Sequence, residues 1–251
     1  MPYTEESYEN SLIELFQQMG YIHKYGPEVE HDYKSPLFDA EFEESIRRIN
    51  PNVPEAAILD AIYRLKNYEN GTLEQKNKVF TDYLQNGIDV AYHEAGEQKS
   101  AHVYLIDYKD LKNNTFIVAN QWTYEEESVK RPDIVLFVNG LPLVIIELKS
   151  PSRSETDASA GYRQLKNYMK EIPSVFVYNQ ICVMSDMTTS KAGTITSDET
   201  RYMEWKTTDG DYAKTQFATF ETFFNGIFPK ERFLDILKNF ICFSGKLSIH
   251  K

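Results

Sequence analysis

Residues 131–149 read RPDIVLFVNGLPLVIIELK and carry the strongest structural signal in this 251-residue chain. Two runs rich in β-branched and bulky residues, 133–138 and 143–148, flank the pair Asn139-Gly140, which is typical of a tight turn between antiparallel strands. The second run is apolar at nearly every position, as expected of a central strand covered on both faces. The stretch therefore predicts a β-hairpin in the middle of a sheet.

Charged residues gather at the open end of this predicted hairpin. Side chains alternate along a strand, so Glu147 and Lys149 share one face while Leu148 points to the other. A three-residue connection at 139–141 would place Asp133 directly opposite Glu147, where paired Cβ atoms lie roughly 4.5–5.5 Å apart. Two carboxylates and one ammonium group are thus expected to converge at one edge of the sheet.

This convergence has two interpretations. Charges beside a core strand cost free energy unless they are paired or bound to a metal, and two adjacent carboxylates repel each other. A hard cation such as Mg²⁺ removes that repulsion, and Lys149 beside it could position or help to deprotonate an attacking water and stabilise charge on a phosphate. In the alternative, Glu147 and Lys149 form a surface ion pair and Asp133 caps a turn. The proline before Asp133, the Asn-Gly turn and the buried strand together favour the metal-dependent site.

The rest of the chain alternates between helical and extended patterns. Thr4 is a candidate N-cap and Gly20 a stop signal for a first amphipathic helix, and residues 21–38 are expected to form a loop. Further helices are expected at 52–67, 72–85, 156–171, 220–227 and 230–243, and further strands at 102–106, 115–119, 175–178 and 181–184. Helices on either side of a cluster of strands predict an α/β class, with helices flanking a mixed β-sheet.

Composition and charge exclude several classes of protein. The net charge of −11 excludes a globally basic protein that wraps nucleic acid, although residues 131–175 carry +1 while residues 1–70 carry −8. Cys182 and Cys242 lie in apolar runs, which argues against a secreted domain held together by disulfides. No apolar stretch approaches the ~20 residues that span a bilayer, and the polar start is no signal peptide. We expect a cytoplasmic protein without membrane contact.

The helix expected at 156–171 carries a second group of polar side chains. Gln164 and Tyr168 are four residues apart and lie on one face, and Arg163, Lys166 and Lys170 are their neighbours. Such a helix could present an amide, a phenol and positive charge to a DNA backbone. Alternatively, Tyr168 is buried against the sheet and braces the charged strand end from behind. The spacing by itself does not separate these two interpretations.

These motifs together resemble a known family. Pro132-Asp133 followed by Glu147-Leu148-Lys149 resembles the PD-(D/E)XK nuclease superfamily, and the surrounding residues resemble the N-terminal nuclease domain of the restriction (R) subunit of type I restriction enzymes. Gln164 and Tyr168 match the Q-x-x-x-Y element that follows the ExK strand in that family. The stretches VFVYNQICVMSD, GTITSDETRYMEW and FLDILKNFICF, at 175–186, 193–205 and 233–243, are similar to its later landmarks.

The resemblance implies a restriction-endonuclease-like core and a division of the chain. It implies one nuclease domain over residues 1–251, with a mainly helical part at 1–100, a catalytic sheet at 101–200, and closing helices at 201–251 that lead to a motor absent from this chain. It also implies catalytic roles for Asp133, Glu147 and Lys149, with Asp133 and Glu147 as Mg²⁺ ligands. Arg163, Gln164 and Tyr168 become DNA-binding or accessory residues, with Tyr168 expected to be partly exposed.

Related nucleases often supply a further acidic metal ligand from the first helix, and Glu9 aligns to it, although Glu5, Glu6 and Glu14 have the same chemistry. The resemblance implies hydrolysis of double-stranded DNA after translocation driven by ATP, which only the missing motor domains would bind. The implied partners are the methylation and specificity subunits. The rival hypothesis is a non-catalytic module for DNA binding or for docking onto the modification complex.

Overall fold

A computed structural model describes residues 4–94, 96–149, 158–186, 188–208 and 220–243. Its centre is a mixed six-stranded sheet in the order β1-β4-β7-β8-β9-β10. The strands are β1 (Ile22–Tyr25), β4 (Phe116–Asn120), β7 (Ile134–Val138), β8 (Leu141–Leu148), β9 (Ile181–Ser185) and β10 (Ser190–Gly193). The pairs β1–β4 and β8–β9 are parallel and the other neighbours are antiparallel. The predicted α/β class, with a mixed sheet flanked by helices as in a restriction-endonuclease-like core, is confirmed.

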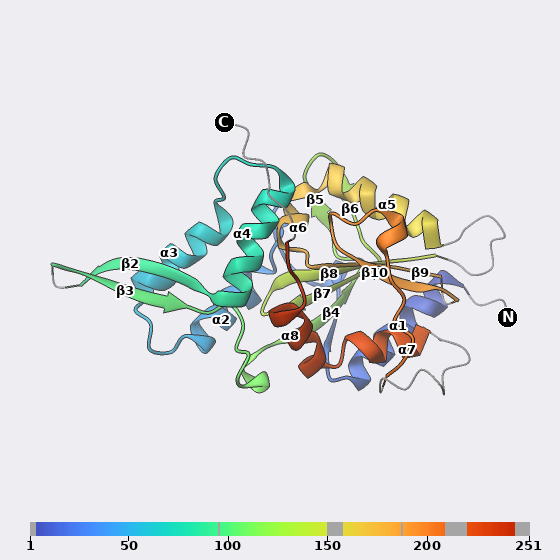
Figure 1. The fold of residues 1–251 in the computed structure, drawn as a ribbon, viewed down its shortest axis with the longest axis horizontal. Helices are drawn as coiled ribbons and strands as arrows, with labels where there is room; N and C mark the ends of the chain where they lie inside the picture. Colours follow the sequence, from blue (N-terminus) through green and yellow to red (C-terminus); the bar gives the residue numbers. More distant parts are fainter. Residues whose placement is uncertain (1–3, 95, 150–157, 187, 209–219, 244–251) are drawn as a thin grey trace.

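Helices cover both faces of this sheet (Figure 1). One face is covered by α1 (Glu5–Gln18), α7 (Phe220–Ile227) and α8 (Lys230–Asn239), and the other by α5 (Ala158–Glu171), which is followed by the short α6 (Pro173–Tyr178). Ile134 and Ile146 belong to the core under α1, whereas Val135 and Ile145 belong to the core under α5. This alternation explains why β7 and β8 are apolar on both sides.

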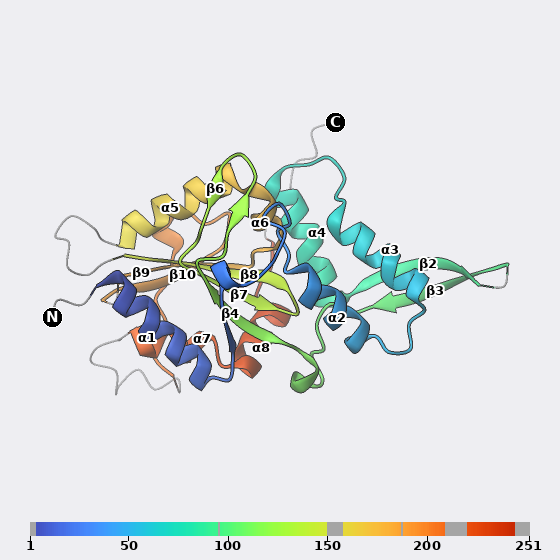
Figure 2. The same cartoon turned by 180° about the vertical axis from the view of Figure 1, so that it is seen from behind.

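A lobe of helices and a hairpin stands beside the sheet, as Figure 2 shows from behind. It contains α2 (Asp39–Ile49), α3 (Glu55–Lys66), α4 (Leu73–Asn86), β2 (Ile88–Glu94) and β3 (Glu97–Val103). The remaining elements are the strands β5 (Tyr124–Glu125) and β6 (Val129–Lys130) and the 3-10 turns η1 (Gly26–Glu28), η2 (Leu111–Asn113) and η3 (Glu199–Arg201). Residues 1–100 are thus largely helical, but they also contain β1, β2 and the start of β3.

The central hairpin reaches the predicted alignment by a different route. The turn has two residues, Asn139 and Gly140, with φ of 52° and 76°, instead of the predicted three. Positive φ at both positions is the geometry that Asn-Gly favours. A bulge between Leu136 and Phe137 then shifts the register by one residue, so that Ile134 pairs with Ile146. The expected alignment of the open end is therefore confirmed, although the expected connection is wrong.

Other local predictions have mixed outcomes. Thr4 caps α1 and accepts a hydrogen bond from Ser7 N, as predicted, and α3, α4, α5 and α7 lie where helices were expected. The predicted loop at 21–38 contains the edge strand β1, whose short sequence has no clear alternation. The predicted strand at 175–178 is wrong, because these residues belong to α6. No helix among the described residues is long and apolar enough to cross a membrane.

Candidate active site

The open end of the β7–β8 hairpin brings together the three residues singled out from the sequence. Asp133 directly precedes β7, Glu147 is the second-last residue of β8, and Lys149 directly follows that strand. Asp133 Oδ2 accepts a hydrogen bond from Leu148 N at 2.7 Å, which fixes the carboxylate against the neighbouring strand. The pairing of Ile134 with Ile146 places Asp133 and Glu147 side by side at the open end of this central hairpin.

Glu147 is a buried carboxylate with only one of its oxygens satisfied. Its side chain is 4% exposed, and Oε1 accepts a hydrogen bond from Lys149 Nζ at 2.5 Å. Lys149 Nζ also donates to Leu148 O at 2.9 Å. The other oxygen, Glu147 Oε2, is buried and has no hydrogen-bond partner among the described residues. A buried, unpartnered carboxylate oxygen costs free energy, so this end of the sheet is not arranged for stability alone.

The electrostatics of the group follow from burial and from like charge. Burial raises the pKa of Asp133 well above its ordinary value and repulsion by Glu147 raises it further, against the hydrogen bond from Leu148. Burial also raises the pKa of Glu147, while Lys149 opposes the shift. Burial alone would lower the pKa of Lys149, but its interactions with Glu147 and Asp133 raise it on balance. Two carboxylates therefore share one ammonium group.

This arrangement fits a hard divalent cation. Mg²⁺ is commonly bound by one or two carboxylates, with water and substrate phosphate as its other ligands. Asp133 and Glu147 could hold such an ion, and the unpartnered Glu147 Oε2 supplies a free oxygen for it. Among the residues that the structure describes, no cluster of three or more His, Cys, Asp or Glu side chains is placed to bind a metal. A metal here would thus depend on these two carboxylates.

Tyr168 stands behind Glu147 and is not exposed. Its side chain is 4% exposed and belongs to the core under α5, together with Leu165 and Ile172. Its hydroxyl donates a hydrogen bond to Arg131 O at 3.4 Å. The hydroxyl is also near enough to the Glu147 carboxylate to lower the pKa of Glu147 in part, against the effect of burial. The expectation of a partly exposed Tyr168 is therefore wrong, because spacings of three and four residues place it on the apolar stripe of the helix with Leu165 and Ile172.

The polar residues around Tyr168 divide into two groups. Gln164 is half-buried and hydrogen-bonds Tyr168, so it belongs to the support of the site. Arg163 and Lys170 are exposed. Lys166 Nζ instead donates to Ile195 O at 2.9 Å and is tied to the protein. DNA contact by Arg163 or Gln164 stays a prediction.

The first helix places two acidic residues near the sheet in different ways. Glu9 Oε1 accepts a hydrogen bond from Asn120 Nδ2 at 2.7 Å, and Glu9 Oε2 accepts one from Gln121 Nε2 at 3.1 Å. The structure thus ties Glu9 to the end of β4, and its role as a metal ligand stays a prediction. Glu5, one turn earlier on the same face, raises the pKa of both Asp133 and Glu147. The spacing of four residues was the signal that could have singled out Glu5.

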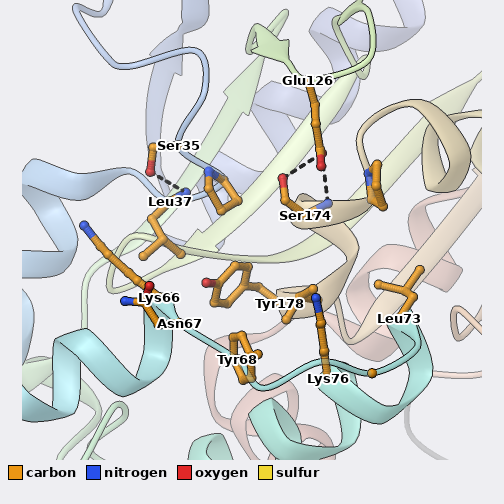
Figure 3. A pocket seen from close by; sticks show the side chains of 14 residues that line it. Ser35, Leu37, Lys66, Asn67, Tyr68, Leu73, Lys76, Glu126, Ser174 and Tyr178 are labelled. Atoms are coloured by element: carbon orange, nitrogen blue, oxygen red, sulfur yellow. Dashed lines mark hydrogen bonds between the residues drawn. The ribbon is translucent and has the colours of Figure 1, made fainter.

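A cavity of about 580 Å³ lies elsewhere on the molecule, between the α3–α4 connection and α6 (Figure 3). Tyr178 and Lys76 line it, and Glu126 Oε2 accepts hydrogen bonds from Ser174 N at 3.0 Å and Ser174 Oγ at 2.8 Å. Asp133, Glu147 and Lys149 do not line it. Gln180 N donates to Leu143 O beside the end of α6, so the cavity lies toward the start of β8, away from Glu147.

Comparison with known proteins identifies the family of this chain. Residues 2–201 match the family model described as type I restriction enzyme R protein N terminus. The chain belongs to this family. It is 31% identical over 265 residues to the putative type I restriction enzyme MjaIXP endonuclease subunit of Methanocaldococcus jannaschii, covering 95% of this chain and 25% of that protein. It is 32% identical over 252 residues to the type I restriction enzyme HindI endonuclease subunit of Haemophilus influenzae, covering 95% of this chain and 24% of that protein. The chain thus spans about a quarter of the length of these relatives.

Proposed function

We propose that this chain is the nuclease part of a type I restriction subunit and hydrolyses phosphodiester bonds in double-stranded DNA with Mg²⁺. The observation that carries the proposal is a pair of neighbouring carboxylates, the half-buried Asp133 and the buried Glu147, with one ammonium group, Lys149, and one oxygen of Glu147 that has no partner among the described residues. Membership of the R protein family and the naming of its relatives as endonuclease subunits support a nuclease.

Asp133 and Glu147 would hold the metal ion. When bound there, Mg²⁺ would polarise the scissile phosphate and make an attacking water more acidic. Hydrogen bonds orient both carboxylates, because Leu148 N donates to one oxygen of Asp133 and Lys149 Nζ donates to one oxygen of Glu147. The remaining carboxylate oxygen of Glu147 is not committed to a donor among the described residues.

Lys149 would act on the phosphate as a charged hydrogen-bond donor. Its ammonium group is held by Glu147 Oε1 and by Leu148 O, which leaves a third hydrogen to donate. Its pKa is raised, so it remains protonated and stabilises negative charge that develops on the phosphoryl oxygens. This role needs a compact ammonium group at the strand end.

The helix α5 would serve both support and DNA contact. Tyr168 braces Glu147 from the core, and Gln164 hydrogen-bonds Tyr168. Arg163 is exposed on the same helix and would contact the DNA backbone. Because the chain carries a net charge of −11, we expect weak intrinsic binding to DNA. Delivery of DNA would depend on an ATP-driven motor and on the methylation and specificity subunits of a cytoplasmic complex.

The variant Glu147→Ala tests this proposal in the full-length subunit assembled with its complex. Cleavage of double-stranded DNA should fall by about 100-fold or more, whereas ATP hydrolysis and translocation should persist. Glu14→Ala, at an exposed position of α1, is the matched control and should cleave normally. Cleavage by Glu147→Ala at close to the wild-type rate would overturn the nuclease assignment and favour a non-catalytic docking or DNA-binding module.

A further inference from the structure

The turn that follows β4 is held in an unusual backbone conformation beside Asp133. Gln121 has a φ of 54°, a left-handed value that non-glycine residues seldom adopt. Its backbone N–H donates to Asp133 O at 3.3 Å. A Cβ atom at Gly26 would lie 2.5 Å from Gln121 O, so the neighbouring backbone packs directly against this turn. Such a conformation persists only where its surroundings determine it.

The carboxylate of Glu9 is the main side-chain anchor of this turn. It accepts one hydrogen bond from the Asn120 side chain at 2.7 Å and one from the Gln121 side chain at 3.1 Å. Asn120 is 6% exposed, and its Oδ1 accepts a hydrogen bond from His23 Nε2 at 2.9 Å. Both ends of the Asn120 amide are therefore engaged, and Glu9 binds two successive residues at the end of β4.

This anchor is connected to the catalytic candidates through Asp133. Asn120 pairs with Ile134, the residue after Asp133, and Gln121 binds the Asp133 carbonyl. The carboxylate of Asp133 in turn accepts the hydrogen bond from Leu148 N. Asp133 is thus held on its backbone by the Gln121 turn and on its side chain by β8.

We propose that Glu9 is a positioning residue, whose carboxylate holds the Asn120–Gln121 turn and through it sets the position of Asp133 opposite Glu147. This inference rests on the proposed function of Asp133 and Glu147 as metal ligands. It assigns Glu9 a different role from that of a third ligand. If Glu9 turned toward a metal, it would release the Gln121 side chain and leave the buried Asn120 Nδ2 without its acceptor.

The conservative variant Glu9→Gln separates the two roles. The carbonyl of the introduced amide can still accept from Asn120 Nδ2, and rotation of the Gln121 amide lets the Gln121 carbonyl accept from the introduced amide nitrogen. We expect Glu9→Gln to cleave within about threefold of wild type in the assembled complex, and Glu9→Ala to lose about tenfold and to require more Mg²⁺ for half-maximal cleavage. Glu14→Gln, exposed on the same helix, should change neither quantity. Equal loss in Glu9→Gln and Glu9→Ala, or no loss in Glu9→Ala, would overturn the proposal.

A double-mutant cycle tests the connection through the turn. If Glu9 acts through Gln121, the Glu9→Ala/Gln121→Ala double variant should be little worse than Glu9→Ala, whereas additive losses would overturn this route. Mn²⁺ binding to the 251-residue chain, measured by electron paramagnetic resonance, should weaken in Glu9→Ala and be retained in Glu9→Gln. Asp133→Asn should abolish both Mn²⁺ binding and cleavage. If Asp133→Asn cleaves normally, the proposed function fails; if it is inactive while Glu9→Ala is normal, only the role of Glu9 fails.

Discussion

Asn139 at the turn of the β7–β8 hairpin and Glu147 at its open end are both buried, but their polar atoms are satisfied to different extents. At the turn, Asn139 is 1% exposed, and its side chain is fully engaged. Its Oδ1 accepts from Thr115 N at 2.8 Å, and its Nδ2 donates to Leu105 O at 3.0 Å and to Asn114 Oδ1 at 2.9 Å. At the open end, Glu147 is 3% exposed and leaves one oxygen without a partner among the described residues.

This difference separates a polar group that stabilises the fold from one that serves the proposed chemistry. The turn residue satisfies every donor and acceptor of a buried amide, which is the usual state of a structural polar residue. The open end instead keeps two repelling carboxylates beside one lysine. Substitutions of the polar residue at the turn should therefore lower the stability more than the activity. Substitutions of the charged residues at the open end should lower the activity more than the stability.

The largest expected effect on the free energy of unfolding comes from substitution of Tyr168, which packs behind the open end. Its aromatic ring belongs to the core under α5, so Tyr168→Ala should lower the free energy of unfolding by about 3–5 kcal/mol. Tyr168→Phe keeps the ring and should lose only about 1 kcal/mol. Urea unfolding of the two variants measures this difference. A shift of less than about 1 kcal/mol in Tyr168→Ala would contradict the placement of Tyr168 in the core.

The next prediction is that substitutions of Lys149 lower cleavage and leave the stability unchanged. An arginine head is wider and planar and cannot occupy the place of an ammonium group held by Glu147 and Leu148 O. Lys149→Arg should therefore be as defective in cleavage as Lys149→Ala, by about 10²–10³-fold. Circular dichroism should show unchanged folding for both variants. Substantial cleavage by the arginine variant would mean that positive charge alone is needed.

The turn end should show the reverse pattern. Asn139→Ala leaves Thr115 N and Leu105 O without their buried partners, and it places alanine at a φ of 52°. We expect a loss of about 2–3 kcal/mol in the free energy of unfolding. In the assembled complex at a temperature where the variant is folded, cleavage should stay within about twofold of wild type. Full stability in this variant would remove the contrast between the two ends.

The smallest effect on the free energy of unfolding is expected for Glu147→Gln. The glutamine carbonyl can still accept from Lys149, and Asp133 remains as its counter-charge, so stability should change by about 1 kcal/mol or less. Because the pKa of Glu147 is raised in the folded state, its ionisation opposes folding above the ordinary carboxyl range. Stability of Glu147→Gln relative to wild type should therefore rise between about pH 4 and pH 7, as followed by urea unfolding at each pH. A relative stability that falls over this range would mean that the Glu147–Lys149 pair is net stabilising.

Local signals in the sequence predicted the hairpin and the charged side chains that meet at its open end. Alternation assigns Glu147 and Lys149 to one face, and Asn139-Gly140 specifies a turn that requires two positive φ angles. The exact length of the turn was not predictable. The extra residue of the bulge compensates for the shorter turn, and a bulge leaves no clear mark in a run of apolar residues.

Elements that depend on distant partners escaped prediction. The run at 175–178 is rich in valine and aromatic residues and has the composition of a strand, yet α6 is helical. Pro173 starts it, and Asn77 from α4 donates hydrogen bonds to the carbonyls of Phe176 and Val177. Likewise, β1 is defined by its parallel pairing with β4, from Ile22 with Ile117 onward, and not by its own four residues.

The sequence by itself determined which side chains meet across β7 and β8, because a strand has only two faces and the pairing register assigns each residue to one of them. The tertiary structure alone decided how the helices are turned against those faces. The packing of α5 buries Tyr168 behind Glu147, and the packing of α1 carries Glu9 to the Gln121 turn while Glu5 stays near the carboxylates. A helix could pack on the sheet at several rotations about its own axis that differ by small angles. Only its contacts with the sheet select one of these rotations.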